Sequence, residues 1–506
     1  MFEKLKQLKG PAFDSLLLAI IQIVTYATNI ITTKVLSISL SLKEYGTYST
    51  VNTVITIAAA ITLFGLGDSM NYFFNRDLGK NTENREREEY VNTIFFVQFV
   101  IGIFVGILLI ISSKWISLYY NNILVQSLII IVCLKPWISN ATHLYQVLFV
   151  SSGKAKLIAI RNLVVSIVKI ILIIISVRIF KSLEAIFVCL VLLDVLQLVF
   201  FKEIFGKIRF KTHFLHYNKK LIRSVINYAL PMGIYFVTTT LMREIDKLVI
   251  GRMGSTEDLA IYSNCAKTLP LNIIVTAFAT VLVPYIMKSV SNHDYKQTEV
   301  IMKKYLTIGY MTVWMFSGAL LICAPEAIRF FYSNDYLIGL PLFIIYIFDG
   351  MVQFASVHLV IAADGKANFL MKLSLVLLGV NAVFSVALYK LFSLLNVAIV
   401  GPALATLMIS IIYIYVLVVK SADILEIKVS EFLPIINMFK YAGILFFVGI
   451  IFFVIRNLIF KCGIPWIICM FLVCGGYCGI VCIIYIKKFK TLFNDINNIK
   501  NNIPMS

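Results

Sequence analysis

Residues 91–111 read VNTIFFVQFVIGIFVGILLII, an uncharged run long enough to cross the hydrocarbon core of a bilayer as a single helix. Similar runs recur along the whole chain of 506 residues, in which 60% of residues are hydrophobic and 14% are charged. A soluble domain, by contrast, is about half apolar and about a quarter charged. The runs are continuously apolar, without a two-residue alternation, so an outer-membrane barrel is excluded. The sequence therefore predicts an all-α, polytopic membrane protein.

Fourteen runs of this kind are predicted to be transmembrane helices. They cover residues 14–35, 45–67, 91–111, 123–149, 157–177, 183–201, 226–250, 258–287, 303–324, 338–362, 369–389, 395–419, 436–456 and 464–486. The first run is too long for the apolar region of a signal peptide, and no small-residue cleavage site follows it, so we interpret it as a span. Because the loops between the runs are short, we expect no catalytic domain outside the membrane.

Basic residues are distributed unevenly between the two sets of loops. With the N-terminus taken as cytoplasmic, 30 Lys and Arg residues fall on that side and 10 on the other. This asymmetry follows the positive-inside rule and predicts a multi-pass protein of the bacterial inner membrane with both termini in the cytoplasm. It also accounts for the net charge of +19, which in a soluble chain would suggest a nucleic acid partner. We expect no nucleic acid partner for this chain.

The chain contains an internal repeat. Ser-Gly-Lys-Ala-Lys at 152–156 follows the fourth predicted span, and Asp-Gly-Lys-Ala-Asn at 364–368 follows the tenth. Glu-Tyr-Gly-Thr-Tyr-Ser at 44–49 opens the second span, and Asp-Leu-Ala-Ile-Tyr-Ser at 258–263 opens the eighth. The two spacings differ by only two residues, which indicates duplication of a six-span unit.

This duplication predicts two pseudo-symmetric six-helix lobes followed by two C-terminal helices. The N-terminal lobe is expected at residues 1–215, with spans one to six, and the C-terminal lobe at 216–425, with spans seven to twelve. Residues 426–506 then hold spans thirteen and fourteen and a cytoplasmic tail. Lobes with an even number of spans keep the same orientation, so we expect the substrate path to lie between them.

Charged side chains inside the apolar runs are the first candidates for function, because a charge at the centre of a bilayer costs at least about 2.5–3.5 kcal/mol. Arg243 and Lys247 share a helix face in span seven, and Lys34 has the matching position in span one. A phosphate group would bind Arg as a two-pronged donor and Lys as a point charge. The predicted substrate-binding set consists of Lys34, Arg243, Lys247, Lys135, Lys169 and Lys267.

Uncharged polar residues follow one face of the first span. Gln22, Thr25 and Asn29 recur at steps of three and four residues, as one side of a helix does. Span seven carries Thr238 in the matching region. We expect spans one and seven to face each other across a hydrophilic, cation-lined cavity, which suits an anionic ligand with several hydrogen-bonding groups.

Acidic residues within the spans are candidates for coupling transport to an ion gradient. They are Asp246, Asp349 and Glu244. The expected coupling ion is H+ or Na+, and no cofactor is expected. No metal site is expected either, because Cys474, Cys478 and Cys482 share a face of the last span but have no histidine nearby.

Structural alternatives exist for most of these residues. In the first, Arg243 and Asp246, three residues apart, form a satisfied ion pair. In the second, Lys34, Lys247 and Lys169 extend toward the lipid head groups. In the third, the threonines and the asparagine of the first span form hydrogen bonds between helices.

Several loose motifs resemble one family of bacterial membrane proteins. They are Asp-Lys-Leu-Val-Ile-Gly at 246–251, Ala-Ile-Tyr-Ser-Asn-Cys-Ala at 260–266, Glu-Tyr-Gly-Thr-Tyr-Ser at 44–49, Gly-Leu-Gly-Asp at 65–68, and Asn-Val-Ala-Ile-Val-Gly-Pro-Ala-Leu-Ala-Thr at 396–406. Along most of its length the chain is similar to the Wzx-type polysaccharide (lipid-linked oligosaccharide) flippases. These belong to the multidrug/oligosaccharidyl-lipid/polysaccharide exporter superfamily.

The resemblance implies a V-shaped bundle of two lobes that works by alternating access. It implies that an undecaprenyl-pyrophosphate-linked oligosaccharide crosses the inner membrane for assembly of O-antigen lipopolysaccharide or capsule. Membrane lipid, a polysaccharide polymerase and a chain-length regulator are the implied partners. Lys34, Arg243 and Lys247 match the cationic cavity of the family by position, although the family usually has Arg where this chain has Lys34.

Three other functions stay open. A multidrug or cation antiporter needs an acidic, aromatic cavity, whereas the deep charges in this chain are mostly basic. A lipid II flippase is a nearer alternative, because that family also has fourteen spans and a cationic cavity. A membrane polysaccharide polymerase or acyltransferase would be an enzyme, but the chain has no large external loop and no phosphate-binding Gly-x-x-x-x-Gly-Lys-Ser/Thr loop. We therefore predict a transporter with no catalytic residues.

Overall fold

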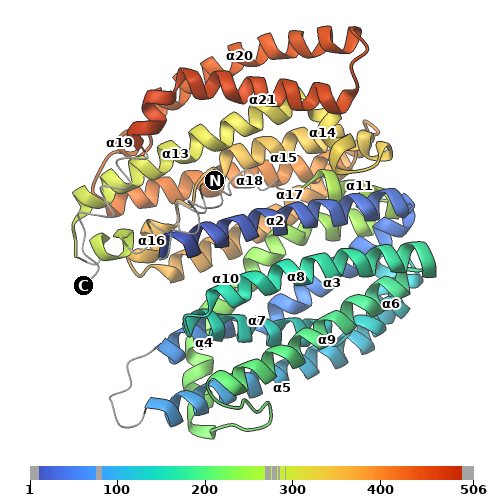
Figure 1. Cartoon of the computed structure of the whole chain (residues 1–506), viewed down its shortest axis with the longest axis vertical. Coiled ribbons are helices and arrows are strands. Elements are labelled where there is room, and N and C mark those ends of the chain that lie inside the picture. Colours follow the sequence, from blue (N-terminus) through green and yellow to red (C-terminus); the bar gives the residue numbers. More distant parts are fainter. Residues whose placement is uncertain are drawn as a thin grey trace. The chain divides into compact units, whose positions relative to one another are not determined.

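The structure, a computed structural model, describes residues 11–75, 83–267, 275, 282, 285–290 and 292–492, and it describes no side chains for residues 11–23, 83, 84, 155 and 367. Within these ranges the chain is helical and contains no β-strand (Figure 1). This agrees with the all-α fold that the apolar runs predict.

The helices follow one another along the chain with short connections. Those up to residue 253 are α2 (Pro11–Ser39), α3 (Leu42–Leu63), α4 (Leu66–Asn75), α5 (Glu83–Tyr119), α6 (Leu124–Val132), α7 (Lys135–Ser151), α8 (Ala155–Ile175), the π-helical turn η1 (Ser176–Phe180), α9 (Leu183–Ile208) and α10 (Lys219–Met253). The later ones are α11 (Thr256–Cys265), α13 (Tyr295–Ile322), α14 (Ala324–Phe331), the 3-10 turn η2 (Asn334–Gly339), α15 (Leu340–Val352), α16 (Leu359–Ala363), α17 (Ala367–Ser393), α18 (Val400–Ile424), α19 (Val429–Phe432), α20 (Ile435–Lys461) and α21 (Trp466–Ile484).

Among the described residues, 12 helical stretches are long and apolar enough to cross a membrane. Each coincides with one of the fourteen predicted spans. Of the other two, span 14–35 falls on α2, where no side chain before Val24 is described, and span 258–287 falls partly outside the described residues. The chain is therefore a multi-span membrane protein.

The chain divides into two compact units, Met1–Ala260 and Ile261–Ser506. In the first unit, α2 packs along α8, and α7 packs against α3, α4, α5 and α9. Helix α10, the seventh predicted span, belongs to this unit because it packs on α3, α4 and α5. In the second unit, α18 packs against α15 and α17, and α13 packs against α15, α20 and α21. The division into repeated segments at 1–215 and 216–425 remains a prediction.

The glycine turns of the two repeats have the same local structure. Gly153 and Gly365 both adopt the left-handed conformation, with φ of 72° and 73°, which glycine enters without steric penalty. Around Gly153 the amides of residues 152, 153 and 154 donate to the carbonyls of residues 148, 150 and 149. Around Gly365 the amides of residues 364, 365 and 366 donate to the carbonyls of residues 360, 362 and 361. The same three hydrogen bonds thus recur 212 positions later, as duplication of this turn predicts.

The second predicted span continues beyond residue 67, where it was expected to end. Phe64 and Gly65 both adopt left-handed backbone angles, and the chain then resumes as helix α4. A Cβ atom on Gly65 would lie 2.4 Å from the carbonyl oxygen of Ala229, and one on Gly233 would lie 2.8 Å from that of Phe64. The glycines therefore let the break between α3 and α4 touch the backbone of α10 directly.

The tenth predicted span, 338–362, is shorter than expected. Helix α15 ends at Val352, and α16 begins only at Leu359. Within the gap, the Ser356 amide donates to the Tyr305 hydroxyl at 3.1 Å, and the Val357 carbonyl accepts from Ser421 at 3.4 Å. Non-helical backbone at membrane depth needs such internal partners, because lipid supplies none.

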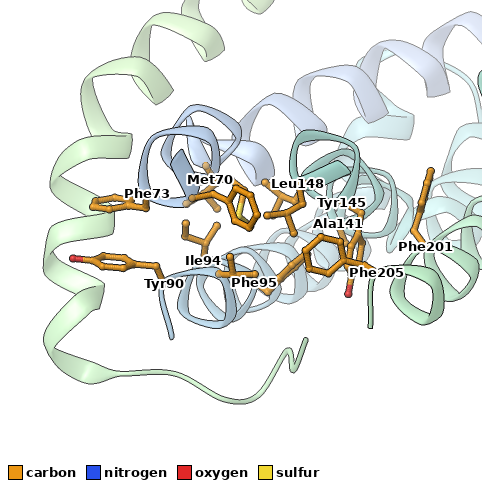
Figure 2. Close-up of a cluster of buried hydrophobic side chains, with 14 of the residues drawn as sticks. Met70, Phe73, Tyr90, Ile94, Phe95, Ala141, Tyr145, Leu148, Phe201 and Phe205 are labelled. Atoms are coloured by element: carbon orange, nitrogen blue, oxygen red, sulfur yellow. The ribbon is translucent and has the colours of Figure 1, made fainter. Parts of the chain in front are cut away.

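The core of the first unit is an aromatic cluster that fixes the orientation of α4 (Figure 2). Met70 and Phe73 of α4 point into it, and the Phe73 ring stacks on Tyr90 of α5 with centroids 4.3 Å apart. On the side of α7, Tyr145 and Phe149 pack among aromatic residues of α5 and α9. Because the apolar side of α4 is held in this core, its opposite side must face outward from the unit.

The two C-terminal helices are fixed to the second unit by a buried ion pair. Arg456 of α20 donates from its Nε and a terminal nitrogen to the two carboxylate oxygens of Glu326 in α14, at 3.2 and 2.5 Å. Their side chains are only 13% and 3% exposed. Tyr441 of α20 also donates to the carbonyl oxygen of Met311 in α13 at 2.7 Å. Helices α20 and α21 are therefore anchored by specific polar contacts as well as by packing.

Removing the carboxylate of Glu326 should destabilise the fold, because it leaves the Arg456 charge buried without a partner. Replacing both residues with apolar ones should restore most of the loss. For Glu326→Ala we expect a loss of about 3–5 kcal/mol in the free energy of unfolding, and near-wild-type stability for Glu326→Leu with Arg456→Met. The measurement is unfolding of the purified protein by SDS titration in mixed micelles.

Glu299 offers a matched control, because it pairs with Lys303 one helical turn away at a more exposed position. Glu299→Ala should change the free energy of unfolding by less than about 1 kcal/mol. Equal losses for Glu299→Ala and Glu326→Ala would contradict the anchoring role of the buried pair.

Candidate functional site

The charged turn of α10 brings two of the predicted residues together. Lys247 donates to the Glu244 carboxylate at 2.8 Å, and the same carboxylate accepts from the Thr53 hydroxyl of α3 at 3.1 Å. The Lys247 and Glu244 side chains are 22% and 11% exposed. Lys247 is therefore neutralised within the protein, and the carboxylate that pairs with it is Glu244.

Arg243, unlike Glu244 and Lys247, has an exposed side chain. Within the described part of the chain it makes no ion pair and no side-chain hydrogen bond. The ion pair with Asp246 that the helical spacing allows is therefore wrong; Asp246 is buried at 2% exposure. An unpaired guanidinium on a membrane-crossing helix is costly against lipid, so Arg243 requires water or an anion around it.

Lys135 belongs to a polar network inside the first unit. Its ammonium pairs with Asp194 of α9, and Asp194 also accepts from Ser139 at 3.0 Å and from Gln197 at 3.4 Å. Gln197 in turn accepts from Arg161 of α8. The network ties α7, α8 and α9 together, and it gives Lys135 a structural partner instead of leaving its charge available to a ligand.

Several threonines of span one form hydrogen bonds within their own helix. Thr28 and Thr32 donate to backbone carbonyls of α2, as Thr33 does to the carbonyl of Asn29. Thr25 is half-buried and Asn29 is exposed. The side chain of Gln22 lies outside the described residues. Thr238 of α10 is buried and donates to the carbonyl of Ile234 at 2.7 Å, in the same manner as the α2 threonines.

The remaining predicted lysines are spread over the first unit and the start of the second. Lys34 and Lys169 are half-buried on α2 and α8, and Lys267 is exposed just after α11. Helix α2 packs along α8 and α10 packs along α3, so no extensive packing joins α2 to α10 among the described residues. The cavity predicted between spans one and seven stays a prediction.

Asp349 of α15 is a buried carboxylate without a cationic partner in the described part of the second unit. It is 2% exposed, and Gln353 donates to its Oδ2 at 2.9 Å while Oδ1 is buried without a hydrogen bond. Gln353 also donates to the Ser410 hydroxyl of α18 at 3.0 Å. Burial of a carboxylate with so few hydrogen-bond partners is costly in free energy.

Helix α4 carries a polar face that the sequence analysis missed. Asp68, Asn71, Tyr72 and Asn75 are all exposed, and their spacing of three, four and seven residues places them on one side of the helix. The other side is in the aromatic core. Because α4 forms the last ten residues of the 34-residue stretch Leu42–Asn75, an aspartate and two asparagines on its outer face need water or polar partners.

Side chains of α7 and α10 extend this face. Asn71 Oδ1 accepts from Asn75 at 2.8 Å and from the Ser151 hydroxyl of α7 at 3.1 Å. The Tyr72 ring stacks on Tyr228 of α10, with centroids 4.4 Å apart and planes 16° apart. These five residues, Asn71, Tyr72, Asn75, Ser151 and Tyr228, are called the tyrosine–amide patch below.

A signal for the patch was present in the sequence. The polar residues from Asp68 to Asn75 have the period of an amphipathic helix, but they follow Gly65 and Gly67, which are typical of a helix end. The expected span, 45–67, ended before this face, so these polar residues were not included in a helix.

A family model described as polysaccharide biosynthesis protein matches residues 35–341, which is more than half of the chain. This confirms the family resemblance that the sequence motifs indicated. No curated protein sequence matches the chain.

Solved structures of transporters share the fold. The lipid II flippase MurJ in an inward closed conformation has a TM-score of 0.72 at 14% identity, with 94% of this chain and 100% of that chain covered. An inward-facing multidrug resistance MATE family transporter of the MOP superfamily has a TM-score of 0.60 at 11% identity, with 80% and 98% covered. A MOP superfamily transporter from Pyrococcus furiosus has a TM-score of 0.55 at 12% identity, with 82% and 97% covered. At these identities the similarity shows the fold alone, and it confirms the predicted fold class.

The pairing of Glu244 with Lys247 can be measured with a double-mutant cycle. Glu244→Gln and Lys247→Met each remove one charge, and we expect the double variant to lose less stability than the sum of the two. The coupling should be about 0.5–1.5 kcal/mol in SDS unfolding of the purified protein.

Arg243→Met combined with Glu244→Gln is the matched control, because Arg243 has no ion-pair partner in the described chain. Its effects should be additive within about 0.5 kcal/mol. Additive effects for Glu244 and Lys247 as well would show that their contact contributes nothing.

Proposed function

We propose a function from one premise, that the chain belongs to the family of polysaccharide biosynthesis proteins. The proposed function is a flippase that moves undecaprenyl-pyrophosphate-linked oligosaccharides across the bacterial inner membrane by alternating access, for O-antigen or capsular polysaccharide assembly. The lipid tail stays in the bilayer while the charged, hydroxyl-rich head crosses through the protein. The observation that carries the proposal is Arg243, a cation without an ion-pair partner in the described chain, on a membrane-crossing helix.

A cation fixed on a helix lowers the main free-energy barrier to this transport, which is the dehydration of the pyrophosphate. Moving a pyrophosphate through hydrocarbon removes its hydration, which in an idealised continuum estimate costs on the order of tens of kcal/mol. A guanidinium held on a helix replaces part of that hydration with two parallel hydrogen bonds to phosphate oxygens. Arg243 fits this role because it is exposed and is not occupied by a carboxylate of the described chain.

Lys247 would contribute less than Arg243. Glu244 already holds its ammonium at 2.8 Å, so an arriving phosphate competes with a built-in carboxylate. This competition weakens the binding of the phosphate by Lys247. Weak binding suits a transporter, because the cargo must be released on the other side of the membrane. Lys34 and Lys169, half-buried in the same unit, are further candidates for contact with the anionic head. Lys135 would contribute less than Arg243 for the same reason, because Asp194 pairs with it.

Lipid II is the nearest alternative cargo, and the high structural similarity to the lipid II flippase MurJ favours it over an organic cation. Both lipid cargoes carry a pyrophosphate, so Arg243 serves either one. The family match favours polysaccharide units.

The proposed partners follow from this cargo: membrane lipid around the protein, and a polysaccharide polymerase and chain-length regulator that receive the exported unit.

Coupling to an ion gradient is proposed for Asp349. A carboxylate that is buried and lacks a cation can exchange a proton or Na+ between the two states of a transport cycle. Binding of the ion removes the uncompensated negative charge, so it favours the state in which the site is closed. Glu244 is a weaker candidate than Asp349, because Lys247 neutralises its charge and both Lys247 and Thr53 donate to its Oε2.

Charge reversal at Arg243 should abolish transport. In a host that lacks its own copy of this protein, Arg243→Glu should reduce surface polysaccharide at least tenfold, and lipid-linked units should accumulate on the inner leaflet, because a carboxylate repels the pyrophosphate. Surface glycan and membrane-protein level are measured together by immunoblot.

Arg252→Glu is a matched control, because Arg252 is exposed on the same helix near its end. It should retain most of the surface glycan. Full activity of Arg243→Glu at normal protein level would refute the cargo role of Arg243, and rescue of a strain depleted of its lipid II flippase would identify lipid II as the cargo.

Asp349→Asn should keep the hydrogen bond with Gln353 but remove the exchangeable charge. We expect normal protein level and at least a tenfold loss of surface polysaccharide, measured in the same complementation assay. Asp423→Asn is the control, because Asp423 is exposed at the end of α18. Equal activity of Asp349→Asn and wild type would exclude Asp349 as the coupling site.

A further inference from the structure

We propose that the tyrosine–amide patch is the subsite that holds the sugar residues of the cargo, separate from the cationic position of Arg243. This rests on the proposed function, because it assigns a second binding site to the same lipid-linked substrate. The patch combines three features: unused hydrogen-bonding groups, an exposed pair of stacked rings, and no cationic side chain among its members.

The amides of the patch are only partly used inside the protein. Asn75 Nδ2 donates to Asn71 Oδ1 and to the Ser151 hydroxyl, and Ser151 donates to Asn71 Oδ1. In the described part of the chain this leaves Asn71 Nδ2 without an acceptor and Asn75 Oδ1 without a donor. A free donor beside a free acceptor matches the hydroxyl groups of a sugar, each of which donates and accepts.

The two tyrosines add an apolar surface of the right shape. Tyr72 and Tyr228 are 44% and 38% exposed although their rings are stacked on each other. One face of a pyranose ring carries mostly C–H groups and packs well against a flat aromatic surface, while the phenol hydroxyls stay available for hydrogen bonds. Phe73 contacts Tyr228 edge-on from the core, so the pair is held in place from behind.

The charge of the patch argues against a phosphate at this position. Its five members are uncharged, and the exposed residue next to it on α4 is Asp68. A pyrophosphate finds no cation among these five residues and an anionic neighbour in Asp68, whereas Arg243 offers it a cation. On α10, Tyr228 and Arg243 are separated by fifteen residues, which is about 22 Å along a helix. One helix therefore carries a surface for each end of an extended glycan–pyrophosphate head.

An organic cation is the other small ligand that tyrosines and an aspartate can bind. The free donor on Asn71 is of no use to a cation, whereas a sugar uses both the donor and the acceptor. The two ligands also differ in their need for Asp68: a cation requires its charge, and a neutral sugar does not.

The experiment uses the full chain in lipid nanodiscs and native mass spectrometry, which identifies bound lipids by mass. The probes are the lipid-linked oligosaccharide pool of the host, undecaprenyl pyrophosphate without sugar, and tetraphenylphosphonium as an organic cation. The variants are Asn71→Ala with Asn75→Ala, and Tyr72→Leu. Tyr72→Phe keeps the stacked ring if Tyr72→Leu is poorly folded, and Asn227→Ala removes an exposed amide next to Tyr228 as a control.

The patch variants should bind the glycan-bearing lipid about tenfold more weakly and undecaprenyl pyrophosphate as well as wild type does. Arg243→Ala should weaken both lipids, and Asn227→Ala neither. Equal binding of the glycan-bearing lipid by wild type and patch variants overturns the subsite, as does an equal loss for both lipids. Loss of tetraphenylphosphonium binding in the patch variants and in Asp68→Asn identifies a cation site instead. If wild type itself does not prefer the glycan-bearing lipid, the proposed function fails and not only the subsite.

Discussion

The structure depends on one constraint, which is that a polar group on a membrane-crossing helix must find a partner or water. The chain meets it in three ways. Threonines such as Thr28 and Thr238 donate to a carbonyl of their own helix. Charged residues pair across helices, as Lys135 does with Asp194 and Arg456 with Glu326. Among the residues that the structure describes, Arg243, Asp349 and the outer face of α4 are not fully accounted for by these three kinds of contact. These polar groups are the candidates for function.

The sequence alone predicted the helices well, because the length of an uncharged apolar run is decided by the bilayer and not by tertiary detail. It also predicted the glycine turns of the repeat at Gly153 and Gly365, where a local motif specifies the backbone. These successes share one property: the signal lies within a short stretch of chain.

The failures lie where the answer depends on packing between distant segments. Helical spacing permits Arg243 to pair with Asp246. In the structure the ion pair instead joins Lys247 to Glu244, and Thr53 of α3 donates to the same carboxylate. The partner of Lys135, Asp194, lies 59 positions away in the sequence, and helical spacing gives no sign of it. The second predicted span ended at residue 67, but Phe64 and Gly65 form a bend against the backbone of α10 and the chain continues as α4. No local pattern contains this information.

The attachment of α20 and α21 has a mechanical meaning. Because Arg456 and Tyr441 hold these helices to α14 and α13, we expect the α20–α21 hairpin to move together with the second unit. The two helices enlarge the perimeter of the second unit that contacts lipid. Any movement of this unit within the bilayer therefore displaces more lipid than the same movement would without α20 and α21. The bilayer would then resist movement of the second unit more than movement of the first.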